Sequence, residues 1–381
     1  MALQFGVFDH IEPVPGLSLE KIYHERLIQI ERLDQAGFYA YHLAEHHTPA
    51  VHSLAPSQNV FLAAVSQHTK RLRFGPCVYV LPLHHPIRLI EEISMLDHLS
   101  GGRLEIGVGR GGVLEAFFWG QDSDVEVNYA RFLETLAIMR EGLSKEELTY
   151  HGEFYDFDAL PMRLSAKQSP YPPLWYMRNI DTSAVYGMNA LLDVPMWEFE
   201  PYVKRYRELW EEYHGLPLAT PQGARPKIGL IMHLLLADTD AEAVAQATPA
   251  WEVYRWNLGS PRRLEAEKRG LTQFLGSNMG ARPASAPSRE VRRDPEAQAR
   301  ALIGGATDSG QRRQNPGGLS TTSIAASPES MREFLDEYIA TGANYFVCSF
   351  QWGDLSHQQA MRSIELFTKE VMPHYVEAPA P

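Results

Sequence analysis

Two pairs of histidines, His46-His47 and His84-His85, are the residues of this chain best suited to chemistry near neutral pH. Each pair follows an apolar run that is typical of a β-strand. Imidazole exchanges a proton close to neutral pH, so it can serve as an acid, a base or a metal ligand. If the two strands are parallel neighbours, their C-terminal ends meet, and we expect one shared catalytic site there.

Within each pair we assign function to one ring. His46 and His85 are the predicted catalytic residues, whereas we expect His47 and His84 to shape their loops by hydrogen bonds to backbone groups. A zinc site is an alternative, but barrel hydrolases hold zinc with spaced ligands such as His-x-His. Neither this pattern nor His-Glu-x-x-His occurs in the two clusters, so we expect no metal.

The glycine-rich segment 107–112 matches the G-x-G-x-x-G pattern of dinucleotide-binding loops. Such a loop normally follows the first strand of a doubly wound sheet, whereas three strand-like runs precede this one. Glycine also allows a backbone to approach a flat ligand closely. On that interpretation Arg110 presents its guanidinium at the site.

Strand and helix patterns alternate almost from end to end. Ser18 is suited to begin the first helix and Gly37 to end it. The alternation predicts a parallel sheet, and eight units within residues 1–381 predict a single (β/α)8 TIM barrel. The eight predicted strands cover residues 4–8, 39–43, 72–81, 103–108, 174–177, 191–194, 228–237 and 344–350.

Residues 256–326, between predicted strands seven and eight, interrupt this alternation and are rich in Arg, Gly, Pro and Ser. A connection of this length is usually a functional lid or a loop without fixed structure. We favour a lid over the C-terminal ends of the strands, and an inert insertion is the alternative.

Composition excludes several classes of protein. The formal net charge of -12 argues against a nucleic-acid binder, and no apolar run is long enough to cross a membrane. The N-terminal residues have the pattern of a strand, not of a signal peptide. The two cysteines, Cys77 and Cys348, lie in apolar runs, so we expect free thiols and a cytoplasmic protein.

Several motifs together resemble those of the bacterial luciferase-like flavin monooxygenases. They occur in the family's order from residue 3 to about 375 and leave segment 256–326 uncovered. The motifs are Glu45-His46-His47, Val80-Leu81-Pro82 with His85-Pro86, Leu96-Asp97-His98-Leu99-Ser100-Gly101-Gly102-Arg103-Leu104, Gly107-Val108-Gly109-Arg110-Gly111, Pro172-Pro173-Leu174-Trp175, and Phe367-Thr368-Lys369-Glu370-Val371-Met372-Pro373-His374.

The resemblance implies that reduced FMN binds at the C-terminal end of the barrel. Because no second nucleotide-binding domain is visible, a separate flavin reductase would supply it. His46 matches the family's catalytic histidine, and His85 matches a second histidine near the flavin. Arg110 and Arg131 match arginines that hold the FMN phosphate. The remaining cofactor-binding residues implied by the resemblance are Cys77, Val78, Gly109, Asn179, Ile180, Thr182 and Ser183.

Some of these residues have simpler interpretations or depart from the family. Taken alone, Arg131 is typical of a solvated charge, and the Asn179 segment is typical of a helix cap. The Cys77-Val78 bond falls where the family often has a cis peptide. Asn179 and Ile180 replace an acidic residue and a serine of luciferase, and Gly109 replaces a cysteine, so light emission is not implied.

The implied reaction is oxygenation by a hydroperoxyflavin, with O2 and an apolar substrate such as an aldehyde or ketone. A neutral His46 could accept a proton or hydrogen-bond the peroxide. The resemblance also suggests a homodimer. The predicted substrate-binding residues are aromatic: Phe8, Tyr79, Trp119 and Trp352.

Three alternatives remain open from the sequence. A smaller branch of the family uses a deazaflavin and transfers hydride instead of oxygen. A flavin-binding protein without turnover is a second alternative, and a metal-dependent barrel hydrolase is a third.

Overall fold

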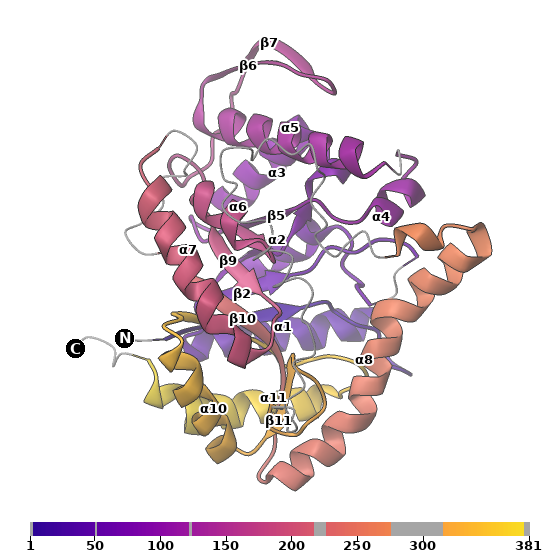
Figure 1. Cartoon of the computed structure of the whole chain (residues 1–381), viewed down its shortest axis with the longest axis vertical. Coiled ribbons are helices and arrows are strands. Elements are labelled where there is room, and N and C mark those ends of the chain that lie inside the picture. Colours follow the sequence, from indigo (N-terminus) through magenta and orange to yellow (C-terminus); the bar gives the residue numbers. More distant parts are fainter. Residues whose placement is uncertain (1–2, 50–51, 122–123, 217–225, 276–314, 377–381) are drawn as a thin grey trace.

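The computed structural model describes residues 3–49, 52–121, 124–216, 226–275 and 315–376. Its centre is a parallel sheet that is nearly closed into a barrel and surrounded by helices (Figure 1). The strands follow one another in the order β3-β2-β1-β12-β10-β9-β8-β5-β4. A bridge between Phe74 and Leu104 brings β3 against the residues before β5 and closes the ring. The predicted TIM barrel is therefore confirmed.

The barrel strands are β1 (Gln4–Asp9), β2 (Ala40–Leu43), β3 (Arg73–Pro76), β4 (Tyr79–Val80), β5 (Ile106–Gly109), β8 (Leu174–Met177), β9 (Asn189–Leu192), β10 (Ile228–Leu236) and β12 (Tyr345–Ser349). All eight predicted strands occur, with the third divided into β3 and β4 by the cis peptide Cys77–Val78. The sixth lies two residues earlier than predicted. The cis peptide matches what the family resemblance implied.

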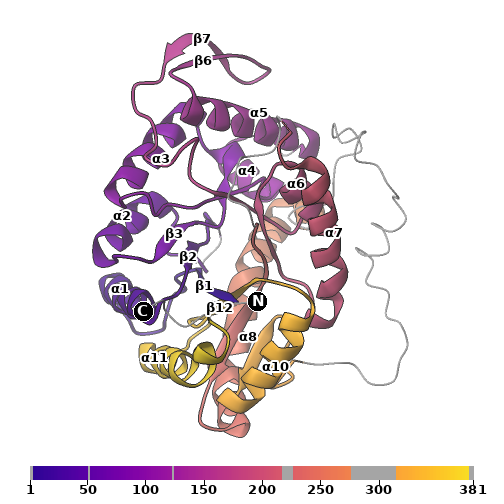
Figure 2. The same ribbon diagram turned by 90° about the vertical axis from the view of Figure 1, so that its left-hand side faces the viewer.

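Helices cover the outside of the barrel, as Figure 2 shows from its end. They are α1 (Leu19–Ala36), α2 (Gln58–His68), α3 (Pro86–Leu99), α4 (Val113–Phe118), α5 (Val125–Ser144), α6 (Ile180–Val185), α7 (Phe199–Tyr213), α8 (Asp240–Arg269), α10 (Pro328–Ala340) and α11 (His357–Leu366). Helix α1 begins and ends as predicted: the Ser18 side chain accepts from the Lys21 N–H, and Gly37 adopts a left-handed φ of 86°.

Two pairs of elements lie outside the predicted alternation. An antiparallel hairpin, β6 (Glu147–His151) and β7 (Asp156–Pro161), projects beyond α5 (Figure 1). Strand β11 (Ser323–Ala326) pairs with the end of β10 and leads into α10. Of the predicted insertion 256–326, residues 256–269 continue α8, and residues 276–314 lie outside the described part of the chain.

The glycine-rich segment is explained by close packing between strands. A Cβ at Gly109 would lie 2.5 Å from the Val78 side chain, and one at Gly111 would lie 2.3 Å from that of Val80. Strand β5 therefore approaches β4 more closely than any side chain allows. This geometry within a barrel confirms that the segment is not the dinucleotide-binding loop of a doubly wound sheet.

Within the described residues, no helix has the length and apolar character needed to cross a membrane.

Candidate active site

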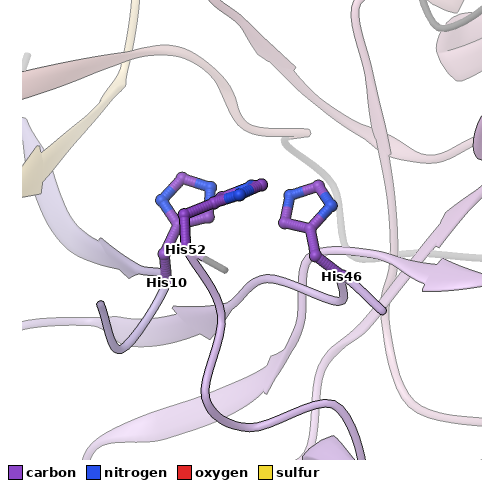
Figure 3. Close-up of side chains that lie close together, drawn as sticks. All are labelled: His10, His46 and His52. Carbon is purple, nitrogen blue, oxygen red and sulfur yellow. The ribbon is translucent and has the colours of Figure 1, made fainter. Parts of the chain in front are cut away.

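Three histidine rings meet at the C-terminal end of the barrel, which we call the mouth. His10 follows β1, His46 follows β2, and His52 lies farther along the loop after β2 (Figure 3). The ring centroids of His46 lie 5.5 Å from His10 and 4.2 Å from His52. Figure 3 shows a nitrogen of His46 turned toward the other two rings, and one nitrogen from each ring lies within 4.8 Å of the others.

The chain after β1 is bent sharply, and this bend directs His10 into the mouth. Ile11 has a φ of 52°, a left-handed conformation that a β-branched residue rarely adopts. Asp9 stabilises the bend by accepting a hydrogen bond of 2.8 Å from the Ile11 N–H. Arg26 in turn forms a buried ion pair of 2.8 Å with Asp9. A conformation held in this way is typical of functional sites.

Their surroundings favour the neutral form of four histidines, His10, His46, His52 and His233. Burial lowers the pKa of His10 and of His52 well below the usual value, and the neighbouring His46 adds to both shifts. Burial also lowers the pKa of His46, followed by the charge of Arg262, while Glu115 opposes the shift. His233 on β10 has a pKa of about 4 because of burial. A neutral ring can donate a hydrogen bond from one nitrogen and accept one at the other, and burial makes its charged form costly.

Two further residues contact His46 directly. Arg262 on α8 donates from Nη2 to His46 Nδ1 at 2.6 Å and to Glu115 Oε1 at 2.7 Å. The same Glu115 oxygen lies 3.4 Å from His46 Nδ1. Neither side chain is more than 11% exposed. Arg262 could not be identified from the sequence, because it lies 216 residues from His46 along the chain.

His47 and His84 shape the loops of the mouth, as predicted, but their partner is a carboxylate and not the backbone. His47 Nε2 lies 2.7 Å from Glu45 Oε1, and His84 Nε2 lies 3.0 Å from Glu45 Oε2. The Val80 N–H also donates to Glu45 at 3.1 Å. Burial opposes ionisation of Glu45, but His84 and His47 outweigh it and lower its pKa to about 2.

The structure places His85 apart from this cluster. His85 is exposed at the beginning of α3, and its ring lies 5.5 Å from that of Tyr155 and 6.4 Å from that of Phe157. Phe157 lies on β7, and Tyr155 lies in the turn that joins β6 to β7. A catalytic role for His85 stays a prediction.

The two arginines assigned to a phosphate lie near the N-terminal end of α5. Arg110 is 9% exposed and donates to the Asn128 amide oxygen at 3.3 Å. The Arg131 guanidinium lies 4.2 Å from the centre of the Phe154 ring. Burial lowers the pKa of Arg110, so a bound anion would offset the cost of that buried charge. The residues present therefore fit a phosphate group.

The other predicted cofactor residues form two groups. Cys77, Val78 and Gly109 lie where β3, β4 and β5 meet, with Val78 packed against Gly109. Asn179 caps α6 by accepting from the Thr182 N–H at 2.9 Å, and Ser183 Oγ donates to the Asn179 carbonyl at 2.8 Å. Ile180 begins α6.

The predicted substrate residues also divide into two groups. Phe8 packs edge-on to His10 at 4.8 Å and so lines the histidine cluster, whereas Trp352 lies 6.0 Å from His233 on β10. Tyr79 hydrogen-bonds to Asn59, and its ring lies 5.5 Å from His84. Trp119 is 48% exposed and packs against His47 at 4.5 Å. Tyr79 and Trp119 thus lie beside the two rings that bind Glu45.

Helix α8 contributes aromatic residues that sequence reasoning did not assign. Tyr254 lies 4.3 Å from His233, and Trp251 lies 5.7 Å from Trp352. Asn257, one turn after Tyr254, donates to the buried Glu12 carboxylate at 3.1 Å. These contacts, together with Arg262, hold α8 against the mouth. The spacing of apolar residues in α8 predicts a helix, but it does not show which part of the barrel that helix covers.

Comparison with known proteins identifies the family of this chain and proteins that share its fold. The luciferase-like monooxygenase family matches residues 3–345. Protein y4wF of Sinorhizobium fredii is 31% identical over 371 residues, which are 97% of this chain and 96% of the relative. The FMN complex of the oxygenating constituent of 3,6-diketocamphane monooxygenase from Pseudomonas putida has the same fold, with a TM-score of 0.69, 18% identity and full coverage of both chains. Coenzyme F420-dependent tetrahydromethanopterin reductase from Methanopyrus kandleri also shares it, with a TM-score of 0.63, 18% identity and coverage of 98% and 100%.

Proposed function

Because the chain belongs to the luciferase-like monooxygenase family, we propose that it oxygenates a small organic substrate with reduced FMN and O2. One observation carries this proposal. The mouth combines a neutral His46 with two arginines, Arg110 and Arg131, on a neighbouring part of the same barrel end. A proton-handling group and a phosphate site are the two features that such a reaction requires.

We assign the cofactor to residues on β3, β4, β5, α5 and α6. Arg110 and Arg131 would hold the phosphate, with Asn179, Ile180, Thr182 and Ser183 beside it. Cys77, Val78 and Gly109 would face the flavin ring. When bound, reduced FMN supplies the two electrons that split O2, so that one oxygen atom enters the substrate and the other leaves as water.

The histidine cluster would handle the proton in this reaction. His46 is neutral, so it can donate a hydrogen bond to a developing oxyanion or accept a proton from it. The rings of His10 and His52 lie directly beside it, and Phe8 packs against His10 behind them. The described residues 256–269 of α8 would cover the mouth through Arg262. His85 has no contact with His46 in the structure, so we give it no step.

The proposal includes a separate reductase, a homodimer and a cytoplasmic location. The reductase is supported by the fold, because the described residues form one barrel without a second nucleotide-binding domain. The oxygenating constituent of the diketocamphane enzyme has the same fold. The location is supported by the thiols of Cys77 and Cys348, which are free and buried.

A deazaflavin-dependent hydride transfer is the second candidate, because the F420-dependent reductase has the same fold. Anaerobic titration with reduced FMN and, separately, with reduced F420 distinguishes the two, with tryptophan fluorescence as the signal. We expect tighter binding of reduced FMN and a loss of at least tenfold in Arg110→Ala. Arg88→Ala, which removes an exposed arginine on α3, is the matched control. Tighter binding of reduced F420 would overturn the proposal in favour of the second candidate.

A further inference from the structure

One guanidinium contacts both His46 and the Glu115 carboxylate beside it. Arg262 Nη2 lies 2.6 Å from His46 Nδ1 and 2.7 Å from Glu115 Oε1, and that oxygen is itself 3.4 Å from the same Nδ1. Arg262 and Glu115 therefore compete for one nitrogen of one ring. Both are nearly buried, so water contributes little to the competition.

The two competitors require opposite tautomers. A guanidinium can only donate hydrogen bonds, and an ionised carboxylate can only accept them. At 2.6 Å from Arg262, His46 Nδ1 must accept, so it carries a lone pair. A neutral imidazole has one N–H, which must then lie on Nε2. If Arg262 were absent, Glu115 would be the partner, and the proton would lie on Nδ1.

We propose that Arg262 is a positioning residue that fixes the proton of His46 on Nε2. This inference rests on the proposed function in treating His46 as the reacting group, although the tautomer can be measured without any reaction. Figure 3 shows a nitrogen of His46 turned toward His10 and His52, and Nδ1 is already engaged by Arg262. With Arg262 in place, His46 presents an N–H donor to the interior of the mouth.

The same argument decides whether the three histidines form a metal site. Their nitrogens lie within 4.8 Å of one another, but a protonated nitrogen cannot bind a metal ion. The adjacent guanidinium also repels a divalent cation. Without Arg262, Nδ1–H would donate to Glu115, an arrangement typical of histidines that bind zinc. Arg262 therefore excludes a metal ion from this cluster.

The direct test is the ¹⁵N NMR spectrum of histidine-labelled, flavin-free protein, with the His46 signals assigned by their loss in His46→Gln. We expect the Nε2–H tautomer in the native chain and the Nδ1–H tautomer in Arg262→Gln. Arg262→Lys, which retains a charged donor, should restore the native tautomer. Glu115→Gln leaves Arg262 in place and should keep the proton on Nε2. An Nδ1–H tautomer in the native chain, or no change in Arg262→Gln, would overturn the proposal.

A second measurement is independent of the tautomer spectrum and of activity. We expect Co²⁺, titrated into the flavin-free protein, to bind Arg262→Gln at least tenfold more tightly than the native chain. The double variant Arg262→Gln/His52→Ala should lose this gain. Equal Co²⁺ affinity in the native chain and Arg262→Gln would count against the proposal. Neither experiment uses FMN, so failure here leaves the cofactor titration unaffected, and failure of that titration leaves these results standing.

Discussion

The carboxylate of Glu45 lies 3.0 Å from Nε2 of His84, which joins the loop after β2 to the loop after β4. His47 binds the same carboxylate at 2.7 Å from the other side. His46 is the neighbour of both Glu45 and His47 in the chain. These two contacts thus fix the backbone on either side of the residue to which we assign the chemistry.

Replacing Glu45 with Gln should destabilise the protein above pH 5. The pKa of Glu45 falls from 4.5 in the unfolded chain to about 2 in the folded protein. The stabilisation is therefore present above pH 4.5 and is lost as the pH falls toward 2, with a magnitude on the order of 3 kcal/mol. Urea unfolding at a series of pH values measures it. Glu91→Gln, on the exposed face of α3, is the control. If the free energy of unfolding of Glu45→Gln fell with decreasing pH as steeply as that of the native chain, this account would be contradicted.

Glu12, which anchors α8, should have the opposite pH dependence. Burial raises its pKa from 4.5 to about 7, although Asn257 and the Gly353 N–H donate to it. A raised pKa gives stability that is present below pH 4.5 and lost as the pH rises through 7. We expect Glu12→Gln to remove this slope and to unfold at higher urea than the native chain at pH 8. If stability depended on pH in the same way in the two proteins, folding would not raise the pKa of Glu12, and the prediction would be wrong.

The close approach of β4 and β5 leaves no room for a side chain at Gly109. Gly109→Ala would place a Cβ 2.5 Å from the Val78 side chain and should cost about 1–3 kcal/mol of unfolding free energy. Shortening the opposing side chain in Gly109→Ala/Val78→Ala should recover part of the loss. Gly259→Ala on α8 is the matched control, because its Cβ meets nothing within 4 Å and should stabilise the helix by about 0.5–1 kcal/mol. Equal stability of the two single variants would contradict the packing argument.

The barrel could be predicted from the sequence because its strands are short buried runs between helices of clear period. The β6–β7 hairpin could not, because its residues are largely exposed and carry no continuous apolar pattern. Strand β11 and helix α10 were not predicted, because they lie at or directly after the end of the segment 256–326, whose composition is typical of a loop. The ends of β9 were displaced by two residues, since strand ends depend on partners that a single sequence does not reveal.

The site was predicted in part, and the limits have a physical cause. His46 could be located because it directly follows a strand, and a strand end fixes its place in a barrel. Glu115 and Arg262 could not, because their role depends on contacts across 69 and 147 residues of chain. His10 was visible at the end of the first strand, but its orientation depends on the left-handed Ile11 that follows it.

The most direct test of the central claim is the reaction of bound reduced FMN with oxygen. Protein loaded anaerobically with reduced FMN is mixed rapidly with O2 while the absorbance of oxidised flavin is recorded. We predict that this absorbance returns more slowly than for free reduced FMN and that His46→Ala removes most of the delay. His68→Ala, at an exposed ring on α2, is the control and should keep the delay. Reoxidation at the rate of free FMN, or a delay that His46→Ala leaves unchanged, would contradict the account.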